Sequence, residues 1–287
     1  MVRPLKVLIT GGQGQLGRDV AAACAAAGDD VAAPGHADLD VADRDSVLGA
    51  LTGWQPDLVV NCAAWTAVDA CEGDPVRAYA ANALSARWLG EGARRSGAHL
   101  VHLSTDYVFN GAKAGPYHEW DGPEPRSVYG ASKLAGEREL LRSGAGATIV
   151  RTSWVCGEHG VNMVKTVLRL LQGEGPLRFV TDQRGCPTFA ADLAPLLRLL
   201  GVSRVPGVVH ATNQGAVSWF EFALAIAMAA GEDPGRIEPV TAAELLPPRP
   251  APRPHNSVLD NLVLRHSGIP LLPPFTQSLP RLVDRLR

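Results

Sequence analysis

The sequence predicts an α/β fold in which helices cover a parallel sheet and a smaller domain is interleaved toward the C-terminal end. Three observations predict it. Short apolar runs rich in β-branched residues recur along the first half of the chain, as in buried parallel strands. Helical stretches separate them, so that strands and helices alternate. A glycine-rich turn at residues 11–17 joins the first strand to the first helix.

The first strand and its turn predict a dinucleotide site. Residues 5–10 (LKVLIT) run into glycines spaced G-x-x-G-x-x-G, and an alanine-rich helix follows. Glycine allows a diphosphate to approach the backbone closely, and a helix N-terminus offers free N–H groups and a partial positive charge. This context favours a Rossmann-type fold over a glycine turn of purely structural use. The cofactor-binding residues predicted in the turn are Gly11, Gly14, Gln15, Leu16 and Gly17.

The second strand, residues 30–33, bears on the choice of cofactor. It ends in Pro-Gly-His at residues 34–36, where an NAD site would place an acid for the adenosine ribose. The missing acid favours NADPH, and NADH stays possible because no arginine is evident for the 2′-phosphate. Asp40 fits either an adenine contact or a loop acid. Asp43 is the predicted N-cap of a helix that runs through Leu51.

Two further strands bring polar residues to one edge of the sheet. Residues 57–64 form the third apolar run, residues 75–96 are helical by period, and residues 98–103 form the fourth strand. The fourth strand delivers Ser104 and Thr105 at its carboxyl end, where ligands bind in open α/β sheets. His99 and His102 lack carboxylates at ligand spacing, so we interpret them as core residues.

Tyr129 and Lys133 stand four residues apart in a predicted helix. This spacing places both side chains on one helix face. An ammonium beside a phenol lowers the pKa of the phenol, toward the range useful to a general acid. Y-x-x-x-K by itself also fits an exposed tyrosine and a solvated lysine. The hydroxyls at the tip of the fourth strand favour the catalytic interpretation.

The second half of the chain predicts the domain division. A strand at residues 148–150 is followed by a helix at 162–172, a return to the sheet through 177–180, and a helix at 192–200. Residues 208–210 form the last sheet strand, and residues 219–230 form a helix. We expect a dinucleotide-binding domain of residues 1–152 and roughly 181–213, and a substrate-binding domain of roughly 153–180 and 214–287.

Composition restricts the partners. The formal net charge is −2, and basic residues are scattered, so nothing indicates binding to nucleic acid or membrane. No stretch of 18 apolar residues and no signal-peptide pattern occurs. Five widely spaced cysteines without C-x-x-C are typical of free thiols in a reducing compartment. The sequence therefore predicts a cytoplasmic protein without membrane spans.

The glycine turn, residues 104–109 (STDYVF) and Tyr129-x-x-x-Lys133 together resemble the extended short-chain dehydrogenase/reductase family. Further stretches narrow the resemblance to its reductases of dTDP-linked 4-keto-6-deoxyhexoses, and they run in the same order over nearly the whole chain. These stretches are residues 61–69, 151–155, 182–188 and 253–260.

The resemblance implies a role for each matching residue. Thr105, Tyr129 and Lys133 are the implied catalytic residues, and Tyr129 and Lys133 are also expected to contact the cofactor. The other implied contacts are Asp40 and Val41 beside the adenine, Ala63 and Ala64 beside the cofactor riboses, and Thr66, Val68, Thr105, Asp106 and Trp154 at the sugar.

The implied reaction is NAD(P)H-dependent reduction of the C4 keto group of dTDP-4-dehydro-L-rhamnose to dTDP-L-rhamnose. Thr105 is expected to hydrogen-bond the carbonyl oxygen, Tyr129 to protonate it, and Lys133 to hold the nicotinamide ribose. Two alternatives remain: a reductase of a related dTDP-4-keto-deoxysugar in natural-product biosynthesis, and a non-catalytic regulatory subunit of the same fold.

One departure from the family concerns metal. Relatives that dimerise through a shared magnesium ion use glutamates, whereas this chain has Gln15 and Ala191 where acids are expected. We therefore predict no bound metal and a monomer or weak homodimer.

Overall fold

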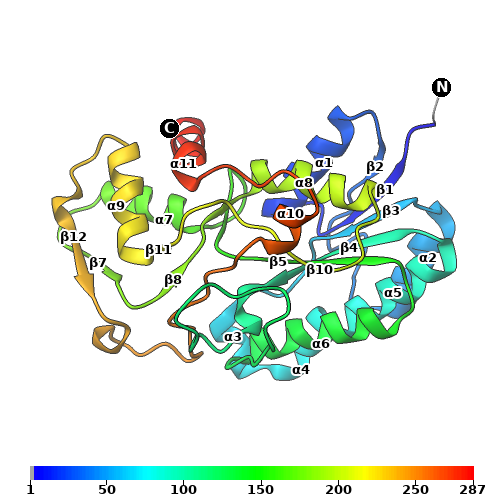
Figure 1. Cartoon of the computed structure of the whole chain (residues 1–287), viewed down its shortest axis with the longest axis horizontal. Helices are drawn as coiled ribbons and strands as arrows, with labels where there is room; N and C mark the ends of the chain where they lie inside the picture. The colour runs from blue at the N-terminus through cyan, green and yellow to red at the C-terminus, as the bar shows by residue number, and fades with distance from the viewer. Residues whose placement is uncertain (1–2) are drawn as a thin grey trace.

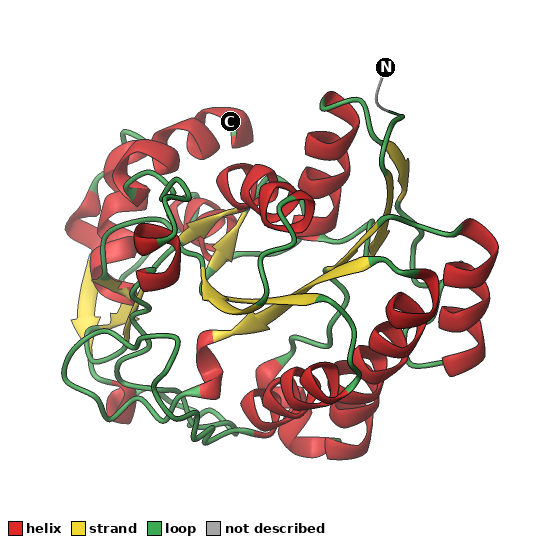
Figure 2. Cartoon of the chain, turned by 45° about the vertical axis from the view of Figure 1, so that its right-hand side comes forward, coloured by secondary structure: helices red, strands yellow, loops and turns green. Residues whose placement is uncertain are grey.

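A six-stranded parallel sheet forms the centre of the molecule, in a computed structural model that describes residues 3–287 (Figures 1 and 2). The strand order is β10-β5-β4-β3-β1-β2. The strands are β1 (Lys6–Thr10), β2 (Asp30–Ala32), β3 (Leu58–Asn61), β4 (His99–Thr105), β5 (Ala147–Thr152) and β10 (Gly207–His210). β2 pairs with one edge of β1 and β3 with the other, so the strand order reverses at β1. The switch point beside β1 is where open α/β sheets bind ligands.

Helices cover both faces of this sheet, as Figure 2 shows. On one face, Val20 and Cys24 of α1 (Gln15–Ala26) and Leu197 of α8 (Ala190–Val202) pack in a core with strand residues. The second face has its own core. The helices that contribute to it are α2 (Arg44–Trp54), α5 (Ser85–Ser96) and α6 (Val128–Arg142). The predicted Rossmann-type α/β sheet is confirmed.

Most predicted elements occur near their expected positions. Asp43 caps α2 as predicted, since its side chain accepts from the backbone N–H groups of Asp45 and Ser46. The predicted helix at residues 75–96 is continuous but changes pitch. It consists of α4 (Pro75–Tyr79), a π-helical turn (Ala80–Leu84) and α5, and it is preceded by α3 (Val68–Gly73). π-turns recur at functional sites, and this one holds the buried Asn82.

Asn82 joins two segments near the edge of the sheet. Its Oδ1 accepts from the backbone N–H of Trp65 at 2.8 Å, and its Nδ2 donates to Ser132 Oγ at 2.9 Å. Ser132 Oγ in turn donates to the carbonyl of Tyr129 at 2.8 Å. The π-turn therefore ties the loop after β3 to the first turns of α6.

Apart from the packing on the two faces of the main sheet, a separate hydrophobic core lies beside the sheet, toward the left of Figure 1. It is called the second core below. Phe222 and Phe275 pack there. Its helices are α7 (Met163–Leu171), α9 (Trp219–Ala229) and α11 (Phe275–Leu286). Its strand pairs are β6 (Val155–Cys156) with β9 (Thr188–Phe189), β7 (Leu177–Val180) with β12 (Ile237–Val240), and β8 (Arg184–Gly185) with β11 (Val217–Ser218).

The prediction that residues 177–180 return to the main sheet is wrong. This segment, β7, pairs in parallel with β12 and stays outside the six-stranded sheet. An isolated run of four residues shows only that a strand is favoured. Its partner is set by the packing of Leu177 and Phe179 against α9 and its neighbours.

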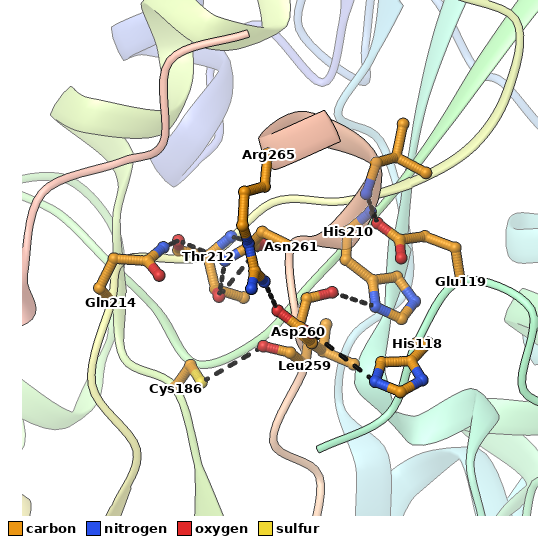
Figure 3. A network of polar contacts seen from close by, with 11 residues as sticks. His118, Glu119, Cys186, His210, Thr212, Gln214, Leu259, Asp260, Asn261 and Arg265 are labelled. Atoms are coloured by element: carbon orange, nitrogen blue, oxygen red, sulfur yellow. Dashed lines mark hydrogen bonds and ion pairs between the residues drawn. The ribbon is translucent and has the colours of Figure 1, made fainter. Parts of the chain in front are cut away.

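A polar network attaches the C-terminal segment to the end of β10 (Figure 3). Glu119 Oε1 accepts from the backbone N–H groups of His210 at 3.1 Å and Val263 at 3.0 Å. Asn261 Oδ1 accepts from the N–H of Thr212 at 2.9 Å. Leu264 of α10 (Leu262–His266) then reaches the core of the main sheet. The C-terminal segment thus packs on the main sheet through Leu264 and on the second core through Phe275. The predicted domain boundaries stay a prediction.

Candidate active site

The glycine turn after β1 folds tightly and leaves the start of α1 uncapped. The N–H of Gly14 donates to the carbonyl of Gly11 at 2.9 Å, and Gly11 has φ +67°, in the left-handed region that glycine favours. Gly14 is the N-cap of α1 and makes no side-chain capping bond. The first-turn N–H groups therefore suit an anion, and the turn fits the diphosphate of a dinucleotide.

Gly17 provides a direct test of this turn. A Cβ at Gly17 would lie 2.2 Å from the carbonyl oxygen of Gly11. Gly17→Ala is expected to destabilise the fold by about 1–3 kcal/mol, as overpacking does, and to weaken NADPH binding. Gly49→Ala is the control, because a Cβ there meets nothing within 4 Å. Unfolding in urea and NADPH titration measure both effects, and equal behaviour of the two variants would contradict the prediction.

A cavity of about 640 Å³ lies at the carboxyl edge of the sheet, beside the glycine turn. It brings together Gly14, Thr105, Tyr129 and Lys133, which come from three separate parts of the chain. Its other lining residues are Gln15, Leu16, Cys62, Ala64, Thr66, Val68, Leu103, Ser104, Asp106, Tyr107, Thr152, Ser153, Trp154, Val155, Val161 and Trp219.

Tyr129 lies near the carboxyl end of β4 because the start of α6 packs closely against the turn that follows this strand. Ser127 caps α6 by accepting from the N–H of Gly130 at 3.1 Å. A Cβ at Gly130 would lie 2.2 Å from the carbonyl oxygen of Tyr107, so only glycine allows α6 to approach the turn after β4 this closely. As a result, Tyr129 and Thr105 line the same cavity, and Tyr107 packs edge-on against Tyr129 at 5.5 Å between ring centroids.

The structure corrects the expected effect of Lys133 on Tyr129. Burial raises the pKa of Tyr129 well above its usual value, and the nearby hydroxyl of Thr105 only partly opposes this. The ammonium of Lys133 donates to the carbonyl of Leu103 at 2.6 Å. Burial lowers the pKa of Lys133 to about 8, against the opposing effect of Glu137. The phenol therefore keeps its proton at neutral pH, as a proton donor requires.

Asp106 follows Thr105 and lies fully inside the protein. Its Oδ1 accepts from Thr105 Oγ1 at 3.0 Å, while its buried Oδ2 has no hydrogen-bond partner. Burial raises the pKa of Asp106 from 3.8 to about 6, and the nearby hydroxyls of Ser257 and Thr105 only partly oppose this shift.

This raised pKa predicts a pH dependence of stability. Between pH 3.8 and about 6 the folded state binds the proton more tightly than the unfolded state, so the stabilisation present below that window is lost as the pH rises through it. Relative to Asp106→Asn, the wild type should lose about 2 kcal/mol of unfolding free energy between pH 4 and pH 7. Urea unfolding of both proteins at the two pH values measures the difference. Identical pH profiles would contradict the burial argument.

Several predicted residues lie outside the cavity lining. Gly11 and Gly17 form the turn itself, and the backbone of Ala63 packs against Gly11. Asp40 is partly exposed and accepts from the N–H of Ala42 at 2.9 Å, whereas Val41 is buried in the core beneath α2. The cavity does not include these residues. Their roles toward a cofactor stay predictions.

Sequence reasoning missed other lining residues. Thr152 and Ser153 follow β5, so the strand-end rule that found Thr105 could also have found them. Val161 and Trp219 carried no comparable signal, because neither follows a strand of the main sheet. Val161 is 90% exposed between β6 and α7, and Trp219 packs against the second core.

The side-chain amide of Gln15 hydrogen-bonds to two other segments of the chain. Its Nε2 donates to the carbonyl of Val155 at 2.9 Å, and its Oε1 accepts from Asn162 Nδ2 at 2.8 Å. Within residues 3–287 no group of three or more His, Cys, Asp or Glu side chains is arranged to hold a metal ion. The absence of a bound metal stays a prediction.

Two findings bear on the expected compartment. In the described part of the chain, no helix combines the length and the apolar character that crossing a membrane requires. All five cysteines lie within that part, and none forms a disulfide.

The Rossmann-type sheet, the glycine turn and the Tyr129–Lys133 helix beside a common cavity define this chain as an extended short-chain dehydrogenase/reductase. The family model described as the RmlD substrate binding domain matches residues 5–287. The chain belongs to this family, as the sequence resemblance predicted.

Individual relatives agree with this assignment. A probable dTDP-4,6-dihydroxy-2-methyloxan-3-one 4-ketoreductase of Streptomyces antibioticus is 44% identical, over 92% of this chain and 90% of its own length. A dTDP-4-dehydrorhamnose reductase of Streptomyces griseus is 41% identical, over 97% and 94%. The structure of dTDP-4-dehydrorhamnose reductase from Bacillus anthracis in complex with NADP superposes with a TM-score of 0.94 at 34% identity, covering 99% of this chain and 100% of that one.

Proposed function

We propose that this protein catalyses the NADPH-dependent reduction of the C4 keto group of dTDP-4-dehydro-L-rhamnose to dTDP-L-rhamnose. The observation that carries the proposal is the convergence of Thr105, Tyr129 and Lys133 in one cavity next to an uncapped, glycine-lined helix start. The names of the relatives support the choice of substrate.

The residues divide the chemistry as follows. NADPH, held by the glycine turn and Lys133, would supply the hydride that C4 of the sugar takes up. Thr105 hydrogen-bonds the carbonyl oxygen, and Tyr129 gives its phenolic proton to that oxygen, so that C=O becomes CH–OH. The raised pKa of Tyr129 keeps this proton in place until the oxygen becomes basic. Lys133, with a pKa near 8, is mostly charged at neutral pH and is placed to hold the nicotinamide ribose.

We assign the cofactor to the glycine turn and the sugar to the opposite side of the cavity. Gly11, Gly14, Gln15, Leu16 and Gly17 hold the diphosphate. Asp40 with Val41 borders the adenine, and Ala63 with Ala64 borders the riboses. Thr66, Val68, Asp106 and Trp154 contact the sugar.

The remaining assignments concern organisation. The dinucleotide-binding domain comprises residues 1–152 and roughly 181–213, and the substrate-binding domain the rest. The protein works in the cytoplasm as a monomer or weak homodimer without metal.

Oxidation of NADPH, followed by its absorbance in the presence of dTDP-4-dehydro-L-rhamnose, tests the proposed function. Turnover that requires the ketosugar, with dTDP-L-rhamnose identified by NMR, supports it. Absence of turnover with either NADPH or NADH would refute it and would favour a non-catalytic subunit.

A second candidate is reduction of a related dTDP-4-keto-deoxysugar. The 44% identity with the probable 4-ketoreductase of S. antibioticus favours it. Thr105 and Tyr129 act only on the C4 carbonyl and Lys133 on the cofactor, so they do not discriminate between sugars that differ elsewhere on the ring. Comparison of kcat/KM for dTDP-4-dehydro-L-rhamnose and dTDP-4,6-dihydroxy-2-methyloxan-3-one distinguishes the two candidates.

A further inference from the structure

Trp154 has a backbone conformation that its side chain disfavours. Its φ is +49°, in the left-handed region that a bulky non-glycine residue rarely adopts. The residue lies between the end of β5 and the start of β6, where the chain leaves the main sheet for the second core. Strained residues of this kind persist only where surrounding structure holds them, and they cluster at ligand sites.

Trp219 packs directly on this indole. The two rings are stacked, with 3.4 Å between centroids and 6° between planes, and both line the cavity. The buried Phe222 supports both rings at 6.4 Å between centroids. The stack therefore joins the second core to the cavity wall.

The indole of Trp154 also packs against Gly185 of β8. A Cβ at Gly185 would lie 2.5 Å from Cε2 and 2.6 Å from Nε1 of Trp154, so the indole fits only against glycine. Gly185 pairs with Val217 across the β8–β11 ladder. The two short strands thus bring the glycine surface and the start of α9 to the same indole.

The position of Trp219 is set by a well-capped helix start. Ser218 accepts from the N–H of Glu221 at 3.1 Å, and Glu221 Oε2 accepts from the N–H of Ser218 at 2.7 Å, which completes a capping box. Trp219 is the first residue of this helix, α9. The capping bonds thus fix where α9 begins, and with it the position from which Trp219 packs on Trp154.

We propose that Trp219 is a positioning residue for sugar-nucleotide binding. Its stacked indole holds Trp154 in the left-handed conformation that places the Trp154 ring on the cavity wall. The inference rests on the proposed function, since it assigns the sugar side of the cavity to Trp154. It adds that substrate affinity depends on Trp219 through Trp154, and that NADPH affinity does not.

A double-mutant cycle tests this coupling. Trp219→Ala is expected to raise the KM for the ketosugar about tenfold while kcat changes less than about threefold, because an indole that positions the bound sugar affects ground state and transition state alike. Trp154→Ala should raise the KM at least as much. The double variant should be no worse than Trp154→Ala alone, since Trp219 acts through Trp154. Effects that multiply would overturn the proposal, because Trp219 would then act independently.

Two further variants keep the test decisive if Trp219→Ala folds poorly. Trp219→Phe keeps an aromatic stack and should restore the KM to within about threefold of wild type. Gly185→Ala displaces the Trp154 indole while Trp219 itself is not substituted. It should raise the KM for the ketosugar as Trp154→Ala does. Trp120→Ala is the control, because Trp120 is 75% exposed and lies outside the cavity.

Calorimetric titration with dTDP-L-rhamnose separates this proposal from the proposed function. If the wild type neither reduces the ketosugar nor binds dTDP-L-rhamnose, the proposed function fails. If the wild type does both and Trp219→Ala binds dTDP-L-rhamnose as tightly as wild type does, only the role of Trp219 is refuted.

Discussion

Tyr129→Phe is expected to lower kcat for ketosugar reduction by about 10²–10⁴-fold, the usual contribution of a positioned general acid. The variant loses the proton that completes the alcohol and keeps the ring that packs against Tyr107. NADPH affinity should change little, because the glycine turn carries the diphosphate. Initial rates of NADPH oxidation and NADPH titration measure the two effects separately.

The control for this variant is Tyr79→Phe. Tyr79 lies on α4, is 41% exposed, and is not among the residues that line the cavity. Its hydroxyl should be dispensable for turnover. If Tyr129→Phe reduced the ketosugar within tenfold of the Tyr79→Phe rate, Tyr129 would not be the proton donor.

Arg151→Met is expected to lower the free energy of unfolding by about 3–5 kcal/mol, as happens when one partner of a buried ion pair is removed. Arg151 on β5 donates to both carboxylate oxygens of Glu137 on α6, at 3.0 and 2.7 Å. The two side chains are only 4% and 2% exposed. The variant therefore leaves the Glu137 carboxylate buried without its arginine, with the hydroxyl of Ser104 as the remaining donor and Lys133 one helical turn away. Urea unfolding monitored by circular dichroism measures the loss.

Two comparisons show whether the cause is the stranded charge. The double variant Arg151→Met/Glu137→Leu should recover much of the loss, because neither charge then remains in the interior. Arg142→Met, which removes an exposed pair with Glu139 on the same helix, should cost less than about 1 kcal/mol. A double variant as unstable as Arg151→Met would instead indicate that packing of the arginine is what matters.

Much of the fold was accessible from the sequence because its signals are local. Apolar β-branched runs that end in glycine mark buried strands, and the turn at Gly11–Gly17 must adopt one of few backbone shapes. The spacing of Tyr129 and Lys133 follows from helix geometry. Thr105 was found because it ends a strand whose carboxyl edge was predictable. Pairings such as β7 with β12 were not accessible, since short strands carry little information about their partners.

The sequence by itself therefore determined the alternating strands and helices, the glycine turn and the helical face shared by Tyr129 and Lys133, because each depends on residues a few positions apart. Only the tertiary structure decided which distant groups meet: Gly130 against Tyr107, Arg151 with Glu137, and the Trp154–Trp219 stack. It also decided the protonation chemistry. The four-residue spacing suggested a lowered pKa for Tyr129, whereas burial of the phenol raises it, and burial is a property of the assembled chain.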